Sequence, residues 1–87
     1  MDKPIHFTNH ARERMVLRGA STDEVVEAIR GGTKREARRS KSQSRLIFPF
    51  DNFSPVNGKW YQNKTVEALY ADEENAIVVL SVKVYYH

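Results

Sequence analysis

The stretch STDEVVEAIRGG, residues 21–32, decides how the chain is organised, because its pattern predicts both where a helix begins and where it ends. Ser21 followed by Glu24 at the third position is a capping box, in which each side chain accepts a hydrogen bond from the backbone N–H of the other residue. An apolar stripe and a terminal pair of glycines complete the pattern: Val25, Ala28, Ile29, Gly31 and Gly32. Beyond residue 32 the apolar residues alternate with polar ones, which is typical of strands.

A further helix is expected just before this one, over residues 9–18. Thr8 or Asn9 can cap its N-terminus, and Gly19 predicts its end. Apolar residues recur at every fourth position and mark the side expected to be buried: Phe7, Ala11 and Met15. The first third of the chain is therefore predicted to be helical.

The remainder of the chain predicts strands. We expect them over four segments, namely residues 34–39, 45–50, 64–71 and 76–86. The turn DEEN separates the last two segments, which are therefore expected to form a hairpin. Pro49 restricts the second segment to an edge of the sheet or to a strand end. Residues 51–63 collect Asp, Asn, Pro and Gly, which predicts a long connection with a small extra hairpin about Asn57-Gly58.

The fold class is therefore α+β, with two N-terminal helices packed on one face of a roughly four-stranded antiparallel sheet. Alternation along the last strand predicts its two faces. The residues expected to face the core are Val78, Leu80, Val82, Val84 and Tyr86. Those expected on the open face are Ile77, Val79, Ser81, Lys83 and Tyr85, followed by His87. With Val66, Ala68 and Tyr70 packed inward, the open face also gains Thr65, Glu67 and Leu69.

The composition predicts one globular domain over residues 1–87. Hydrophobic residues make up 40% of the chain, which suffices for a single modest core. The absence of cysteine excludes disulfides and thiolate chemistry. No segment resembles a signal peptide or a membrane span, so we expect a cytoplasmic protein with no membrane association.

Positive charge is concentrated in KREARRSKSQSR, residues 34–45. This segment carries six basic residues and one acidic residue, whereas the whole chain has a net charge of +3. Such a segment suits a polyanion or an acidic protein partner, and a solvated strand and loop is the alternative. The side chains expected to contact phosphates are Arg18, Lys34, Arg35, Arg38, Arg39, Lys41 and Arg45.

The stretch HFTNHARERMVLRG, residues 6–19, loads the first helix with imidazole and guanidinium groups. At 100° per residue, His10, Arg14 and Arg18 form one stripe at the margin of the core. In the structural interpretation, the two arginines bond backbone carbonyls or a carboxylate such as Glu67. A metal site is disfavoured, because His6 precedes the helix cap and does not face His10, so we expect neither metal nor cofactor.

Phosphate chemistry is the third interpretation of these side chains. Metal-free cleavage of RNA needs a base for the 2′-hydroxyl, an acid for the leaving oxygen and cations for the developing charge. Histidine, lysine, arginine and tyrosine can supply these groups near neutral pH. The candidates for the reaction are His10, Arg14, Lys83, Tyr85 and His87.

Residues 6–32 resemble the N-terminal signature of a family of small bacterial and archaeal proteins, the domain of unknown function 4258. The signature reads H-F-T-x-H-A-x-x-R-M, a short spacer, R-G and then a capped helix ending in glycine, whereas Ala20 and the 51–63 segment depart from the family pattern. The matching positions are His6, His10, Arg14, Met15, Arg18 and Gly19. The resemblance implies the fold of the RelE/ParE-type toxins of toxin–antitoxin modules, many of which are metal-independent ribonucleases acting on messenger RNA. It implies no catalytic assignment.

Two functions are therefore expected. The first is a RelE-like toxin that acts as a metal-independent endoribonuclease on RNA and is paired with an acidic antitoxin protein. The second is a non-catalytic basic domain of the same fold, which binds an acidic protein or nucleic acid, because a shared fold does not decide function. An enzyme requires histidine and cationic side chains to meet in one concavity, whereas scattered residues favour binding alone. The oligomeric state stays open.

Overall fold

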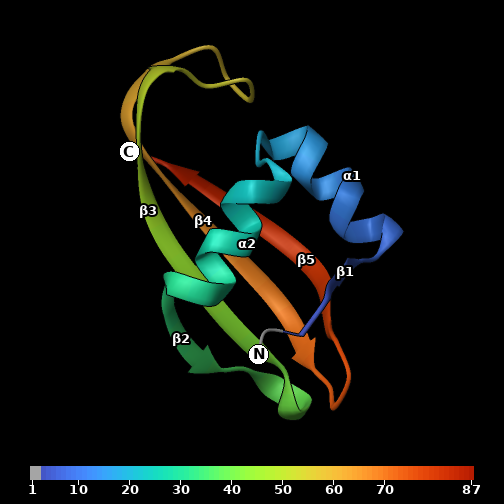
Figure 1. Ribbon diagram of the computed structural model, residues 1–87. Coiled ribbons are helices and arrows are strands. Elements are labelled where there is room, and N and C mark those ends of the chain that lie inside the picture. Colours follow the sequence, from blue (N-terminus) through green and yellow to red (C-terminus); the bar gives the residue numbers. More distant parts are fainter. Residues whose placement is uncertain (1–2) are drawn as a thin grey trace.

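The computed structural model describes residues 3–87. Within them, helices and strands follow one another along the chain as in Figure 1. The helices are α1 (Asn9–Arg18) and α2 (Thr22–Gly31), and a 3₁₀ turn forms η1 (Arg38–Ser40). The strands are β1 (Ile5–Phe7), β2 (Thr33–Glu36), β3 (Ser42–Phe53), β4 (Trp60–Asp72) and β5 (Ile77–Tyr86).

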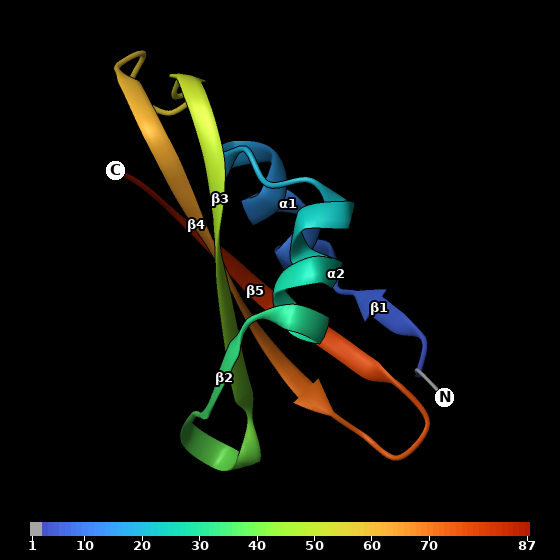
Figure 2. The ribbon, with the colours of Figure 1, turned by 60° about the vertical axis from the view of Figure 1, so that its left-hand side comes forward.

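The two helices cover one face of a single twisted sheet, and its other face is open (Figure 2). The strand order is β1-β5-β4-β3-β2. The four antiparallel strands expected from the sequence are confirmed, through the pairings β2–β3, β3–β4 and β4–β5. The prediction missed β1, which pairs in parallel with the start of β5 and makes the sheet five-stranded and mixed. Three residues before a helix cap are too few to show the alternation from which a strand is inferred.

Both helices begin and end where the sequence predicts. The Thr8 side chain caps α1, and Gly19 ends it with a φ of 81°, a backbone conformation that strains other residues. The capping box forms in both directions, with Ser21 and Glu24 each accepting from the backbone of the other. Gly32 ends α2 where a Cβ atom would lie 2.4 Å from a carbonyl oxygen of β3, so glycine permits the close contact. Neither helix within residues 3–87 has the length and apolarity needed to cross a bilayer.

The segment 51–63 was predicted to be a long connection with a small hairpin about Asn57-Gly58. The hairpin is confirmed, because Phe53 pairs with Trp60 across a turn that contains Gly58, whereas the long connection was wrong. Most of it extends the β3–β4 hairpin beyond the rest of the sheet, as an arm that we define as residues 50–61 (Figure 1). The turn-forming residues instead form a β-bulge in β3 and the turn at the tip of the arm. The register shifts between Pro49 and Asn52, where Asp51 has a φ of 46°, and the turn at the tip contains Gly58 with a φ of 73°.

The edge position predicted for Pro49 is confirmed by the extent of β2. The β2–β3 ladder reaches only to Arg45, so the stretch of β3 that contains Pro49 is hydrogen-bonded on the β4 side alone. The first predicted strand, 34–39, is shorter than expected. The chain turns at η1 instead, through Arg39 and Ser40, which both have positive φ values of 58° and 60°.

A β-bulge in β5 changes which residues face the core. Leu69 pairs with Ser81, but the next residue, Tyr70, pairs with Val79, so Leu80 is an extra residue in β5. Such a bulge shifts the alternation of side chains by one position.

The predicted core face of β5 is therefore correct only after the bulge. Val82 is buried, and Val84 packs against the core, as expected. Before the bulge the assignment was inverted: Val79 is fully buried and Ile77 packs beside it, whereas Val78 and Leu80 do not belong to the core. The buried apolar residues are Ala11, Met15, Val25, Ala28, Val66, Ala68, Tyr70, Val79 and Val82.

The covered face ends in a polar junction between α1, α2 and the arm. Lys64 is only 7% exposed; its ammonium group lies 2.8 Å from the Glu24 carboxylate and donates to the Gly19 carbonyl at 2.9 Å. The Tyr86 hydroxyl donates to the Arg18 carbonyl at 2.6 Å. Burial, and then the charge of Glu24, raise the pKa of Tyr86.

Candidate functional site

The open face of the sheet carries its side chains in rows that cross β3, β4 and β5. Because residues two apart point to the same side of a strand, the face follows from the strand register. The first two rows are Gln43–Leu69–Ser81 and Arg45–Glu67–Lys83. The next two are Ile47–Thr65–Tyr85 and Pro49–Asn63–His87. A charged row therefore lies directly beside a row with an aromatic ring, and a histidine follows.

The charged row has an acidic centre and two basic ends. Glu67 pairs in register with Arg45 on one side and with Lys83 on the other. The closest oxygen–nitrogen distance from Glu67 to Arg45 is 3.9 Å. The Glu67 side chain is 8% exposed, whereas that of Arg45 is 52% exposed. The carboxylate thus lies on the floor of the face, and the two cations reach past it towards solvent.

The histidine at the end of β5 is held by its neighbour on β4. The Nε2 atom of His87 lies 2.8 Å from the hydroxyl oxygen of Thr65. This bond fixes the orientation of the imidazole and leaves Nδ1 as the nitrogen that can meet a ligand. Tyr85 is exposed in the row between His87 and Lys83.

The basic segment continues the open face towards the other edge of the sheet. The Arg35 Nε atom donates to the Gln43 Oε1 atom at 3.1 Å. A cavity of about 210 Å³ lies here, lined by Thr33, Arg35, Gln43, Ser44, Arg45 and Glu67. A wider hollow of about 440 Å³ follows, and its lining includes Arg35, Arg38 and Lys41. Arg39 is exposed at the η1 turn.

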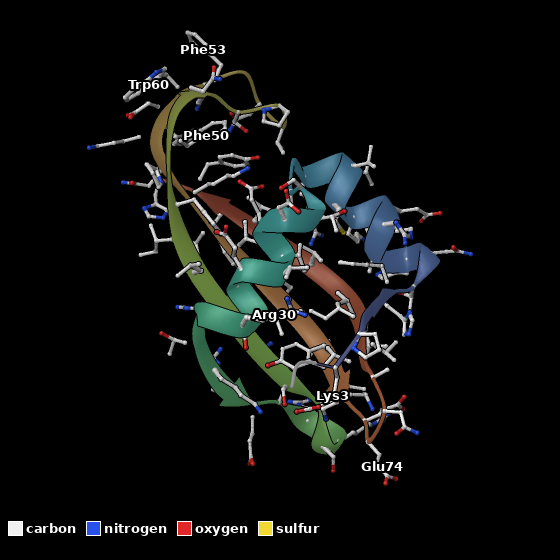
Figure 3. All side chains as sticks on the ribbon, in the orientation of Figure 1. Lys3, Arg30, Phe50, Phe53, Trp60 and Glu74 are labelled. Carbon is white, nitrogen blue, oxygen red and sulfur yellow. The ribbon has the colours of Figure 1, made fainter. Side chains whose placement is uncertain are left out.

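Lys34 points to the other side of β2 from Arg35. Its ammonium group lies 3.8 Å from the carboxylate of Asp72, which also accepts a hydrogen bond from Lys3 (labelled in Figure 3). The hydrogen bond from Lys3, together with the charges of Lys3 and Lys34, outweighs burial and lowers the pKa of Asp72. Lys34 is therefore committed in part to a structural ion pair.

The stripe on α1 lies apart from this face. Arg18 donates to the Val82 carbonyl at 2.9 Å, which confirms the predicted bond from a marginal arginine to a backbone carbonyl. The Arg14 Nε atom donates to the His10 Nε2 atom at 3.4 Å. Within residues 3–87, no hydrogen bond or ion pair joins these three side chains to Lys83, Tyr85 or His87.

The predicted site residues therefore fall into separate groups. The structure brings Lys83, Tyr85 and His87 together with Arg45 on the open face, and it places His10 and Arg14 on the helical layer. Sequence reasoning missed the central place of Glu67 and the bond from Thr65 to His87. The signal is present in the sequence as alternation, but it becomes readable only when the register of three strands is known.

The arm carries exposed aromatic residues that the sequence did not single out. Phe53 and Trp60 are register partners and are 65% and 53% exposed. They lie at the outer end of the arm, whereas Phe50 lies nearer the helices, with its ring centroid 5.1 Å from that of Tyr86 (Figure 3).

Within residues 3–87, no three histidine, aspartate or glutamate side chains gather into a group that could hold a metal ion.

Comparison with known protein families finds a match over most of the chain. The family model described as domain of unknown function (DUF4258) matches residues 7–85 of the chain. No curated protein matches, and no solved structure matches. The match extends the likeness seen in residues 6–32 across the sheet and includes Arg45, Glu67, Lys83 and Tyr85 of the open face, whereas His87 lies beyond the matched residues.

Proposed function

We propose that this chain, which belongs to the DUF4258 family over residues 7–85, is a toxin of the toxin–antitoxin type that cleaves RNA without a metal ion. The proposal includes the RelE/ParE-like fold implied by the sequence signature. The observation that carries it is the sharing of one open face by Arg45, Lys83, Tyr85 and His87. These side chains supply two cations and two groups able to transfer a proton, which is the set that metal-free phosphodiester cleavage requires.

The charged row is the proposed place for the scissile phosphate. Arg45 and Lys83 flank Glu67 and extend beyond it, so an anion above the row meets a cation on either side. A guanidinium group can bind two phosphate oxygens at once, and an ammonium group adds a point charge. Both cations gain strength as charge develops on the phosphate oxygens in the transition state.

The proton transfers are assigned to the next two rows. The His87 imidazole takes the proton from the ribose 2′-hydroxyl as the 2′-oxygen bonds to phosphorus. The bond from phosphorus to the 5′-oxygen breaks, and the Tyr85 hydroxyl donates a proton to that oxygen. The products are a 2′,3′-cyclic phosphate and a 5′-hydroxyl end. Thr65 positions the imidazole through its 2.8 Å contact with Nε2.

His10 and Arg14 have a different place in this proposal. They contact each other on α1, and α1 packs against the covered side of β5. The reaction is therefore assigned to the open face, and the helix pair provides the natural comparison for it. Arg35, Arg38, Arg39 and Lys41 extend the cationic surface beyond the charged row and would hold the flanking phosphates.

A second candidate function is binding without chemistry. The densest positive charge lies at the η1 turn, just before the start of β3. The C-terminal end of β5, where His87 follows, lies well away from this turn along the sheet (Figure 1). A basic surface separated from the proton-transfer groups can bind RNA or an acidic antitoxin protein and need no reaction. Cleavage by the purified protein separates the two candidates.

The test is an RNA cleavage assay with the purified chain in excess EDTA. We expect cleavage with a 2′,3′-cyclic phosphate product, and we expect Lys83→Ala to lower the rate on the order of a hundredfold, since it removes one of the two flanking cations. Arg12→Ala, on the outer side of α1, is the matched loss of one cation and should leave the rate unchanged. RNA that stays intact with the wild-type chain, while still being bound, would leave only the binding function.

A further inference from the structure

Glu67 is unusual among the acidic residues of this chain, because it is nearly buried and yet accepts no hydrogen bond within residues 3–87. Its side chain is 8% exposed, and its ionic partner in this part of the chain, Arg45, lies at 3.9 Å, beyond hydrogen-bond distance. Buried carboxylates are ordinarily hydrogen-bonded, because a carboxylate oxygen that has left water without a donor costs free energy. No buried side-chain oxygen within residues 3–87 lacks a partner, so the two oxygens of Glu67 still meet solvent, and they are acceptors that no protein donor occupies.

A cavity is open to this carboxylate. Glu67 lines the cavity of about 210 Å³ together with Arg35, Gln43 and Arg45. Arg35 holds the Oε1 atom of Gln43 at 3.1 Å, which leaves the Gln43 amide nitrogen as a donor. The cavity thus combines a two-oxygen acceptor on its floor with amide and guanidinium donors on its walls.

We propose that this cavity binds a guanine base, with Glu67 accepting from the N1–H and N2–H groups of the guanine. Arg35 and the Gln43 amide would donate to the guanine O6 and N7 atoms, the acceptors that arginine commonly recognises, which leaves Arg45 for the phosphate. This inference rests on the proposed function, and it adds a base preference to it. The occupant is guanine in an RNA strand, whose next phosphate can reach the charged row that Glu67 shares with Arg45 and Lys83.

The donor pattern of the base decides between guanine and the alternatives. Guanine presents two adjacent N–H donors on its Watson–Crick edge, which match the two oxygens of one carboxylate. Adenine and cytosine each place a ring-nitrogen acceptor beside their amino group, so a carboxylate meets repulsion there. Uracil offers one N–H group between two carbonyl oxygens. A base that covers the two carboxylate oxygens without donating to them removes their contact with water, so the site rejects it.

Binding of short uncleavable RNA tests the proposal. The probes are 2′-O-methyl pentanucleotides of sequence UUXUU, with X as guanine, inosine, adenine, cytosine or uracil, titrated into the full chain by calorimetry. We expect the guanine probe to bind at least about tenfold more tightly than the adenine, cytosine and uracil probes, the range of one good bidentate contact. Inosine, which lacks the N2 amino group, should fall between them. Equal binding of all five probes by the wild-type chain would overturn the proposal.

The variant Glu67→Gln keeps the shape of the side chain but replaces one acceptor oxygen with a donor. We expect it to lower the affinity for the guanine probe to that of the adenine probe, with the adenine affinity unchanged or slightly raised. A guanine preference that survives this substitution would also overturn the proposal. Thermal unfolding reports whether the variant is folded, and the wild-type comparison of guanine with inosine decides the matter even where it is not.

Two controls separate this inference from the proposed function. His87→Ala should lower the rate of cleavage of ordinary RNA on the order of a hundredfold or more and keep the guanine preference in the pentanucleotides, because His87 lies two rows from Glu67. Cleavage without base preference would remove the guanine site and leave the ribonuclease. Guanine preference without cleavage would remove the ribonuclease function and leave the guanine site. Guanosine 5′-monophosphate, titrated alone, distinguishes a site for a free nucleotide from one that needs the RNA strand, and tighter binding of the mononucleotide than of the pentanucleotide would overturn the assignment to RNA.

Discussion

The two faces of this sheet are made by the same three strands, yet they have opposite chemistry. On the side of the helices, Val66, Ala68 and Val82 are fully buried in an apolar core. On the other side, their immediate neighbours Glu67 and Lys83 form part of a charged row. Along β4, and along β5 after its bulge, a residue that packs in the core therefore alternates with a residue that lies on the open face.

Because of this alternation, we expect substitutions at two adjacent residues of a strand to have separate effects. One should lower the stability of the fold, and the other should lower the proposed activity. Catalytic residues lie disproportionately on loops that a rigid scaffold positions. In the proposed site, the strands of the scaffold would themselves carry the reacting groups, on their second face. Adjacent residues of β5 therefore make matched pairs for experiment.

The largest effect is expected from the two histidines that lie on different layers. His87→Ala should lower the rate of RNA cleavage on the order of a hundredfold or more, the usual scale for losing a general acid or base. His10→Ala, on α1, should leave the rate within a small factor of wild type. Single-turnover cleavage of a short RNA is the measurement. A large loss with His10→Ala and none with His87→Ala would place the reaction on the helical layer and break the comparison.

The next effect concerns the adjacent pair Val82 and Lys83. Val82→Ala removes two methyl groups from a fully buried side chain and should lower the free energy of unfolding by about 2 kcal/mol. Lys83→Ala changes an exposed side chain and should alter it by less than about 0.5 kcal/mol. Urea unfolding measures both. Equal destabilisation by the two changes would show that the open face also carries the fold.

A smaller effect is expected at the η1 turn, which extends the cationic surface. Reversing the charge of Arg38 and Arg39 by changing both to Glu should weaken RNA binding on the order of tenfold at low salt. The slope of the logarithm of the binding constant against the logarithm of the salt concentration should become shallower by about 0.7–0.9 for each phosphate that is no longer neutralised. The double change Arg12→Glu and Lys59→Glu alters the net charge by the same amount at other exposed positions, and it is the control. If both variants behave alike, the net charge rather than the turn determines binding.

The smallest effect concerns the neighbouring tyrosines of β5. Tyr86→Phe should lower the free energy of unfolding by about 1 kcal/mol, because it removes the 2.6 Å hydrogen bond to the Arg18 carbonyl. Tyr85→Phe, on the open face, should leave the stability unchanged. Because the pKa of Tyr86 is raised in the fold, its neutral form stabilises the protein below pH 10, and this contribution is lost as the pH rises through the raised pKa. The alkaline loss of stability should therefore diminish in Tyr86→Phe; an identical pH dependence in both chains would contradict the assignment.

Local signals predicted the helices well. The capping box at Ser21, the threonine cap and the two glycine ends act within a few residues, so a single sequence contains the whole cause of each boundary. The four antiparallel strands also followed from alternation. What the sequence could not supply were features that depend on distant partners. The three residues of β1 form a strand only because β5 offers them an edge, and the bulge at Leu80 is defined only against β4.

The candidate site was predictable to the same extent. Alternation placed Lys83, Tyr85 and His87 on the open face, and composition selected Arg45 as a phosphate contact. His10 and Arg14 were predicted as candidates for the same reaction. Their spacing within one helix does not indicate which side of β5 the helix covers, so the sequence could not separate them from the residues of the open face. Glu67 could not be recognised, since its isolation from hydrogen-bond donors depends on side chains from three strands.

The pairing of β1 with β5 has a consequence for how the domain folds. The Thr8 hydroxyl contacts the Leu80 carbonyl at a separation of 72 residues, and α1 packs on the same late strand. Both helices therefore leave the ribosome before the strands that cover their apolar stripes have been made. Long-range contacts of this kind slow folding, because loop closure precedes the gain from packing. Until β5 is complete, Ala11 and Met15 of α1 remain uncovered, whereas α2 packs against the earlier strands β3 and β4. During synthesis, the first helix is therefore the part of the nascent chain that is most exposed to aggregation and to chaperones.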